Sequence, residues 1–228
     1  MPTLLALDAS SSACSCAVWR DGEVFSRFAL TPREHTRRLM PMIDEVLTEA
    51  GLVPADLDAL AYGRGPGSFT GLRIAAGVAQ GLAFGLGRPL IGVSTLQALA
   101  LAAHRQHHLR YVIPALDARM NEIYVAAYHC RDGQLTPLLD EAVMAPQRFS
   151  LPEACRDADW SGVGSGWTLW DSMPPLIQDA LSQRLPDMQP AAAEMARLAA
   201  EAFAAGQGQP AHAVQPVYLR DRVAWQRG

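Results

Sequence analysis

Three short apolar segments at the start of the chain predict a meander of β-strands. Residues 3–7 (TLLAL) are mostly apolar and typical of a buried strand, and residues 14–19 and 24–30 are expected to form the next two strands. An Asp-Gly pair at 21–22 lies between the last two and favours a hairpin turn. The small and polar residues at 8–13 are expected to form the other turn.

After residue 35 the apolar residues have the spacing of a helix. Apolar residues recur every three or four positions in the segment 36–50: Leu39, Ile43, Val46, Leu47 and Ala50. Gly51 is expected to end this helix, and Pro41 to start or kink it. Strands are expected at 59–63 and 90–94, and helices after Ser68, from 95 to about 107 and at 191–206. This order indicates a mixed sheet covered by helices, an α/β fold.

An internal repeat divides the chain. Residues 6–24 (ALDASSSACSCAVWRDGEV) recur as residues 115–135 (ALDARMNEIYVAAYHCRDGQL), each with an aspartate, Asp8 or Asp117, at the end of a predicted strand. A duplicated unit predicts two related subdomains that face each other across a cleft. We expect the first to comprise 1–103, completed by the returning segment 190–228, and a smaller second one to comprise 104–189. Residues 160–190, rich in tryptophan and proline, are expected to be irregular.

The composition is that of a globular protein, with 50% hydrophobic and 18% charged residues in a chain of 228. The formal net charge of −4 provides no positive field for a phosphate backbone, so any action on nucleic acid is expected to depend on a partner. We expect no signal peptide, because no basic residue precedes Asp8, and no membrane span, because the run Ile74–Gly87 has only 14 residues. These features predict a cytoplasmic protein.

The four cysteines form no CxxC pair. They are Cys14, Cys16, Cys130 and Cys155. Cys14 and Cys16, two apart in a predicted strand, point to the same face of the sheet and are poorly placed to pair with each other. We expect free, buried thiols in a reducing compartment.

The stretch GRGPGSFTGLRIAAGVAQGLAFG at 63–85 opens like a phosphate-binding loop and continues as an apolar helix. No Lys-Ser/Thr pair follows its first glycines, as a P-loop requires. Gly77, Gly81 and Gly85 recur every four residues, while bulky apolar residues occupy most of the remaining circumference. Such a helix must be covered nearly all round, and interior glycines are tolerated where another backbone comes close. Either the helix at 36–50 covers it, or another protein does.

Four segments of the sequence resemble the TsaB (YeaZ) family of the actin, hexokinase and Hsp70 superfamily. They are LLALDASSSACSCAV, GRGPGSFTGLRIAAGVAQGLA, PALDARMNEIYVA and PVYLRD. The resemblance implies an actin-like ATPase (ASKHA, ribonuclease H-like) fold with two related subdomains, each a mixed sheet flanked by helices. It also implies a bacterial, non-catalytic scaffold needed to make N6-threonylcarbamoyladenosine (t6A) beside the anticodon of tRNA.

The family resemblance further implies the partners of such a scaffold. These are TsaD, a catalytic paralogue that carries the metal, and TsaE, an ATPase. A homodimer is expected when the chain is alone, and tRNA contact only through the complex. No cofactor of its own is expected, because ATP and metal would be held by the partners.

The helix at 36–50 and the helix after Ser68 are expected to meet the same pair of helices on TsaD, or on a second copy, as a four-helix bundle. Met40 and Met42 would add adaptable side chains to this surface. The expected interface comprises Leu39, Met40, Met42, Ile43, Phe69, Arg73, Ile74, Gly77, Val78 and Gly81.

A metal site is not expected. The HxxxH pair that marks the catalytic paralogue is absent, because His35 is followed by Leu39 at the matching helix. His104, His107 and His108 have helical spacing that could chelate a metal, but they are better interpreted as the C-terminal cap of a helix, where the dipole favours them.

A degenerate nucleotide cleft is the alternative site. It would comprise Asp8, Ser10, Ser11, Asp117, Arg119, Gly164 and Gly166. Asp8 either positions a phosphate or caps the turn at 10–12, and the absence of glycine from that turn favours the cap. Asp117 has Arg119 and Glu122 nearby, which favours an ion-paired structural role. The alternative functions are therefore an ATP-dependent phosphotransferase of the sugar-kinase type or, less well supported, a metalloprotease.

Overall fold

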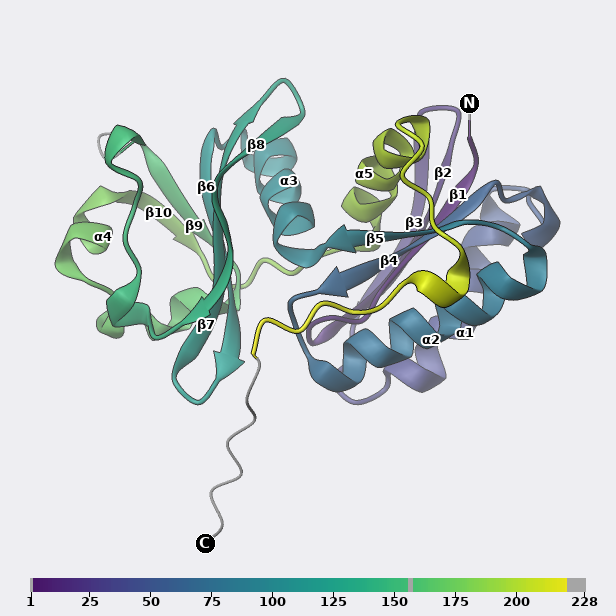
Figure 1. Ribbon diagram of the computed structural model, residues 1–228, viewed down its shortest axis with the longest axis horizontal. Coiled ribbons are helices and arrows are strands. Elements are labelled where there is room, and N and C mark those ends of the chain that lie inside the picture. Colours follow the sequence, from purple (N-terminus) through teal and green to yellow (C-terminus); the bar gives the residue numbers. More distant parts are fainter. Residues whose placement is uncertain (1, 156–157, 221–228) are drawn as a thin grey trace, which may run out of the picture.

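Two five-stranded mixed sheets, each flanked by helices, lie side by side (Figure 1). The computed structural model describes residues 2–155 and 158–220. The first sheet contains β1 (Leu4–Asp8), β2 (Ala13–Arg20), β3 (Glu23–Leu30), β4 (Ala59–Gly65) and β5 (Leu90–Ser94). The second contains β6 (Tyr111–Arg119), β7 (Glu122–Arg131), β8 (Gln134–Met144), β9 (Trp160–Val163) and β10 (Leu181–Leu185).

Five α-helices cover the sheets in the described part of the chain. They are α1 (His35–Glu49), α2 (Phe69–Leu86), α3 (Thr95–His107), α4 (Pro175–Ala180) and α5 (Ala192–Ala204). Short 3₁₀ helices lie at Pro54–Asp56, Pro146–Arg148, Glu153–Cys155, Ser165–Ser172 and Ala211–Ala213.

Both sheets have the same topology. The first has the order β3-β2-β1-β4-β5 and the second, taken in the same sense, β8-β7-β6-β9-β10. In each, three antiparallel strands form a meander and the fourth strand runs parallel to the first. Asp8 ends β1, and Asp117 lies near the end of the equivalent strand β6. The duplicated unit and the actin-like fold expected from the sequence are confirmed.

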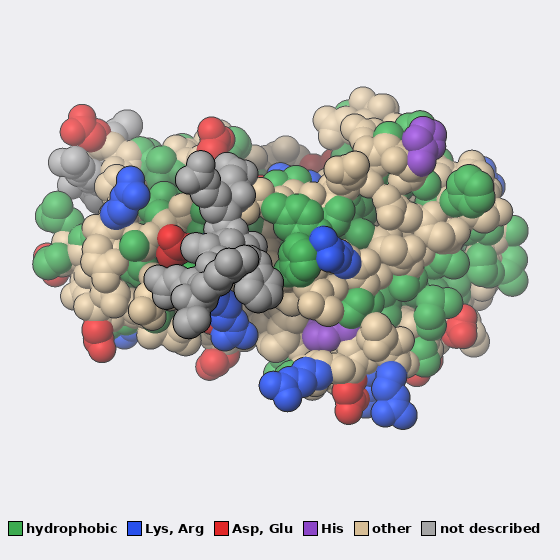
Figure 2. Space-filling model, turned by 60° about the horizontal axis from the view of Figure 1, so that its bottom comes forward, with side chains coloured by type: hydrophobic (Ala, Val, Ile, Leu, Met, Phe, Trp, Pro, Cys, Tyr) green, Lys and Arg blue, Asp and Glu red, His purple; other side chains and the backbone are tan. Residues whose placement is uncertain are grey.

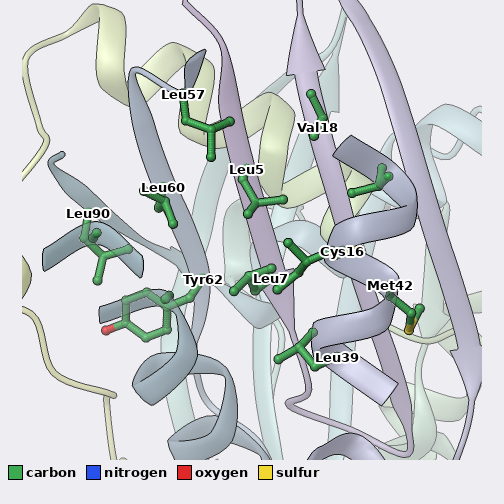
Figure 3. Close-up of a cluster of buried hydrophobic side chains, with 14 of the residues drawn as sticks. Leu5, Leu7, Cys16, Val18, Leu39, Met42, Leu57, Leu60, Tyr62 and Leu90 are labelled. Atoms are coloured by element: carbon green, nitrogen blue, oxygen red, sulfur yellow. The ribbon is translucent and has the colours of Figure 1, made fainter. Parts of the chain in front are cut away.

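The first sheet is buried on both faces. On one face, alternate residues such as Leu5, Leu7 and Leu60 pack under α1 and α2 (Figure 3). On the other, Leu4, Ala6 and Ala61 pack under α5. These strands therefore read as continuous apolar runs because both faces are covered.

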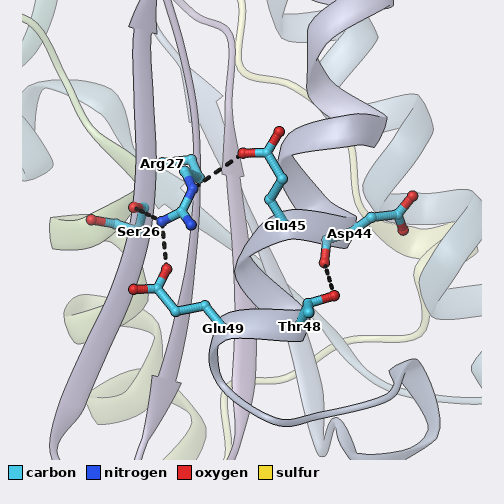
Figure 4. Close-up of polar contacts among 6 residues, drawn as sticks. All are labelled: Ser26, Arg27, Asp44, Glu45, Thr48 and Glu49. Atoms are coloured by element: carbon cyan, nitrogen blue, oxygen red, sulfur yellow. Dashed lines mark hydrogen bonds and ion pairs between the residues drawn. The ribbon is translucent and has the colours of Figure 1, made fainter.

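Ion pairs attach α1 to the edge strand β3 (Figure 4). Arg27 of β3 donates from Nε to Glu45 (3.2 Å) and also binds Glu49. The Thr48 hydroxyl donates to the carbonyl oxygen of Asp44 (2.8 Å) within α1. The two ion pairs hold α1 to β3, and Pro41 is accommodated inside the helix.

Helix α3 packs on the second sheet through apolar residues on one of its faces: Leu96, Leu99, Ala100 and Ala103. Two buried tryptophans, Trp160 and Trp167, fill the opposite face of that sheet. The boundary expected at residue 103 lies inside α3, whereas α5 from the C-terminal part packs on the first sheet. The division into 1–103 with 190–228 and 104–189 stays a prediction, and 221–228 lie outside the described residues.

The segment 160–190 is more regular than expected. It contains β9, α4 and β10. All four residues of β9 are buried between β6 and β10, so the strand shows no alternation of apolar and polar positions. A four-residue strand of this kind has no recognisable period.

Helix α2 is longer than the 14-residue apolar run in the sequence. It has 18 residues, and by length and composition alone it could cross a membrane, which is weak evidence for a span; the expectation of no membrane span stays a prediction. A helix packed in the core of a soluble protein passes the same test, and six residues of α2 are buried: Gly71, Leu72, Ala75, Ala76, Ala79 and Ala83.

All four cysteines are free, as expected. Cys14, Cys16 and Cys130 are buried, and Cys155 is half-buried. Burial raises the pKa of the Cys16 and Cys130 thiols to about 12, which makes these thiols unreactive.

Candidate functional site

The first turn of α2 docks closely on the turn between β1 and β2. The Ser68 hydroxyl caps the helix by accepting from the Gly71 amide (3.3 Å), and the Ser68 amide donates to the Ser10 carbonyl oxygen (2.7 Å). A Cβ atom on Gly71 would overlap the carbonyl oxygen of Ala9. Gly71 is therefore required by the monomer itself.

None of the residues that the structure describes covers the opposite side of α2. Gly77, Gly81 and Gly85 are exposed, and a Cβ atom on any of them would meet nothing within 4 Å. Phe84 beside them is 81% exposed. We call Gly77, Gly81, Phe84 and Gly85 the glycine face. The possibility that α1 covers α2 completely is thereby contradicted for the described residues.

On the side of the molecule formed by α1 and α2, hydrophobic side chains (green) lie among uncharged surface (tan), with charged side chains also present (Figure 2). Met40 of α1 is 43% exposed and Phe69 of α2 is 54% exposed. Ile74 and Val78 are half-buried at the margin of the first core.

Three residues of the expected interface lie elsewhere. Leu39, Met42 and Ile43 are at most 5% exposed and belong to the core under α1. Met42 points inward because it lies three residues after Leu39 on the same helical stripe. They support the surface from beneath and cannot contact a partner without unfolding α1.

An aromatic cluster closes the N-terminal end of this surface. The Arg73 guanidinium lies 3.7 Å from the centroid of the Phe69 ring, and the Tyr218 ring lies 5.4 Å from Phe69. Arg73 Nε donates to the Tyr218 hydroxyl (3.3 Å). Sequence reasoning missed Tyr218, because 145 residues separate it from Arg73 and no local pattern joins them.

Asp8 caps its own turn. The carboxylate is fully buried and accepts from the Ser10 amide (3.2 Å) through one oxygen and from the Ser10 hydroxyl (3.1 Å) through the other. The Ser11 hydroxyl accepts from the Ala13 amide (3.1 Å). Burial raises the pKa of Asp8 to about 7, against the smaller opposing effect of the Ser10 hydrogen bonds. This geometry supports the capping interpretation.

Asp117 is engaged by Arg119. One carboxylate oxygen accepts from the Arg119 amide (2.8 Å) and the other from its guanidinium (3.0 Å). Glu122 binds Arg220 from the C-terminal segment instead of Arg119. In the part of the chain that the structure describes, no hydrogen bond joins the Asp8 turn to the Asp117 turn.

Gly164 and Gly166 approach the chain's own backbone. A Cβ atom on Gly164 would lie 2.5 Å from the carbonyl oxygen of Ala115, and one on Gly166 would lie 2.7 Å from the Ala115 Cβ. Their small size is therefore used to pack on β6. Their place in a degenerate nucleotide cleft stays a prediction.

Among residues 2–155 and 158–220, no group of three His, Cys, Asp or Glu side chains could hold a metal ion. His104 Nδ1 lies 2.8 Å from the Leu109 carbonyl oxygen, and His108 ends α3 in the left-handed conformation with φ 57°. These two histidines form the C-terminal cap expected from the sequence.

Comparison with known proteins identifies the family. The family model described as "TsaD: tRNA N6-adenosine threonylcarbamoyltransferase" matches residues 29–227. The chain is 43% identical over 231 residues to the tRNA threonylcarbamoyladenosine biosynthesis protein TsaB of Escherichia coli (strain K12), covering 98% of this chain and 97% of that protein. The tRNA N6-adenosine threonylcarbamoyltransferase of Ralstonia pickettii is 47% identical over 73 residues, which is 32% of this chain and 21% of that protein.

A solved structure agrees with these sequence matches. YeaZ from Pseudomonas aeruginosa superposes with a TM-score of 0.90 at 43% identity, covering 96% of this chain and all of that one. The matches extend over nearly the whole chain, including both sheets and the uncovered side of α2. The chain therefore belongs to the TsaB (YeaZ) family.

Proposed function

We propose that this chain is a non-catalytic subunit in the biosynthesis of t6A in tRNA, and that it acts by pairing with the transferase TsaD through the glycine face. The observation that carries the proposal is the uncovered stripe of Gly77, Gly81 and Gly85, in which nothing lies within 4 Å of a Cβ position. Interior glycines reduce helix stability, so their presence is best explained by a backbone that packs against them.

The shared sequence supports the choice of partner. A relative named as the transferase is 47% identical to 73 residues of this chain, so the two proteins are expected to share local structure. When two related proteins present equivalent helices, they can pack about a pseudo-twofold axis, each filling the surface that the other leaves open. The same geometry would allow two copies of this chain to form a homodimer when TsaD is absent.

In this proposal the partner proteins, not this chain, bind ATP, metal and tRNA. Both Asp8 oxygens are occupied by Ser10, and Asp117 is occupied by Arg119. The formal charge of −4 disfavours direct binding to the tRNA backbone. ATP, metal and tRNA would therefore be bound by TsaD and by the ATPase TsaE, which the pair would recruit.

The test is reconstitution with purified TsaD, TsaE, a source of threonylcarbamoyl-adenylate and unmodified tRNA. We expect t6A to form with the wild-type chain, and formation to fall to the level without the chain when Gly81→Leu is used. Ala204→Leu, at an exposed site on α5, is the matched control and should support full formation. Equal t6A with and without the chain would contradict the proposal.

The phosphotransferase alternative makes a separate prediction. If Asp8 helps to bind a nucleotide, calorimetry with ATP and magnesium should show binding to the isolated chain, and Asp8→Ala should abolish that binding. The Asp8 carboxylate is buried and already accepts two hydrogen bonds from Ser10, which gives that alternative little support. A metalloprotease would require a bound metal in the purified chain, for which the described residues offer no ligand cluster.

A further inference from the structure

Among residues 2–155 and 158–220, the outer edge of β5 is paired at only one residue. β5 is the last strand of the first sheet, and Leu90 exchanges two backbone hydrogen bonds with Gln209 (2.8 and 3.0 Å). This bridge is antiparallel, so residues 207–208, which arrive from the end of α5, lie on the Gly92 side of Gln209, and after Pro210 the chain turns away along α2 (Figure 1). Because alternate residues of a strand direct their backbone groups to the same edge, the amide and carbonyl of Gly92 point outward as those of Leu90 do. Across the described segments, no strand pairs with β5 at Gly92.

A groove follows this open edge. A hollow of about 990 Å³ is bounded by the end of α5 on one side of β5 and by residues 213–215 on the other. A second hollow of about 380 Å³ shares Arg64 and Gln97 with the first and is lined by Tyr128 and Leu139. The sheet edge therefore lies at the floor of a channel that continues from the first subdomain to β8 of the second.

Tyr62 brings an unpaired polar atom to this groove. Its side chain is 0% exposed, its hydroxyl has no hydrogen-bond partner among the described residues, and it lines the larger hollow. Figure 3 shows the hydroxyl directed away from Leu5 and Leu7. A buried hydroxyl without a partner is costly, but this hydroxyl is sealed from solvent, so an occupant of the groove could bind it only after the surrounding side chains move.

The lining is suited to a peptide backbone. Four amide side chains, which both donate and accept, surround the edge: Gln97, Gln207, Gln209 and Gln215. One positive and three negative side chains complete the lining: Arg64, Asp140, Glu141 and Glu201. Since Arg64 is already paired with Glu141 (3.0 Å), an acidic occupant is disfavoured.

We propose that this groove binds an extended, uncharged or basic peptide segment of a partner protein, which adds to the sheet by pairing with Gly92 of β5. Strand addition takes its affinity from backbone hydrogen bonds and its specificity from pockets for alternate side chains. The hollow between Tyr128 and Leu139 would accept one apolar side chain of the segment. The site is separate from the glycine face and does not depend on the proposed function.

The probe for this proposal is a phage-displayed library of random peptides selected on the full chain. Ala205→Trp places a large side chain in the groove, and Ala204→Trp makes the same change at an exposed neighbour that does not line it. We expect selected peptides to lack acidic residues and to bind Ala205→Trp at least about tenfold more weakly than wild type, while Ala204→Trp binds normally.

Hydrogen exchange provides the second measurement. A bound peptide should slow exchange of the Gly92 amide in the wild-type chain and leave the amides of the glycine face unchanged. Failure to enrich any peptide, equal binding to both tryptophan variants, or protection confined to other amides would each overturn the proposal.

Discussion

Two glycines of α2 should respond in opposite ways to the same substitution. The change is Gly→Ala at position 81 and, separately, at position 71. A Cβ atom on Gly81 would meet nothing within 4 Å, so alanine adds only helix propensity, about 1 kcal/mol of stability. A Cβ atom on Gly71 would overlap the backbone of Ala9, and relieving that overlap should cost at least about 2 kcal/mol.

Urea denaturation and thermal unfolding measure both effects. For a chain of this length, 1 kcal/mol corresponds to a change in Tm of about 2–4 °C, so the Gly77→Ala/Gly81→Ala double variant should gain about 4–8 °C. The measurements should be made at concentrations where size-exclusion chromatography shows a monomer, because an interface would add its own stability.

Enlarging the side chain at position 81 should weaken partner binding, although alanine there stabilises the monomer. A leucine at position 81 inserts four carbons where the proposed partner backbone packs, at a cost of about 2 kcal/mol, or roughly 30-fold in Kd. Co-purification with TsaD and titration by calorimetry would measure it, with Ala204→Leu as the control. If Gly81→Ala destabilises the monomer, the space beside Gly81 is occupied, and the description of the glycine face is wrong. If Gly81→Leu binds TsaD as tightly as wild type does, the interface lies elsewhere.

Three further perturbations test the core, the buried carboxylate and the contact between subdomains. Leu39→Ala should lose about 2–5 kcal/mol in urea denaturation, because Leu39 is 1% exposed; a loss below about 1 kcal/mol would contradict its place in the core. Because the pKa of Asp8 is raised from 3.8 to about 7, the folded state binds the proton more tightly, and stability should fall by on the order of 3 kcal/mol as pH rises from 4 to 8. Asp8→Asn should flatten that slope, and an unchanged slope would assign it to other groups. Glu141→Gln should cost about 1–2 kcal/mol by weakening the bond to Arg64, which is partly exposed; no change in unfolding free energy would show that this ion pair contributes nothing.

Local pattern was sufficient for helix α3 and for the second meander. The segment from Thr95 to His107 forms α3 as expected, because Ser94 caps its start and His108 ends it, both local signals. The repeat of Asp8 at Asp117 predicted the second meander, because a duplicated strand and turn keep their spacing in the sequence. Fold and family could therefore be predicted from the sequence.

Side-chain direction and long-range contacts could not be predicted from pattern. Met42 was expected on the surface, but only the rotation of α1 around its core stripe decides which methionine is exposed, and the structure exposes Met40. Gly164 packs against β6 at a separation in sequence that no motif reveals. Tyr218 likewise reaches Phe69 from a distant part of the chain. Each of these features concerns which segments meet in space, not which segments are helices or strands.

The placement of α5 has a consequence for synthesis of the chain. One face of the first sheet, including Leu4 and Ala61, is covered by residues such as Met195 and Ala199, which are made only after the second sheet. On the ribosome, that apolar face therefore stays exposed to solvent while the whole second subdomain is translated. This favours chaperone binding to the exposed face or a delay in its folding until α5 can pack on it. The N-terminal residues are the first to be made, yet the surface they form is among the last to be buried.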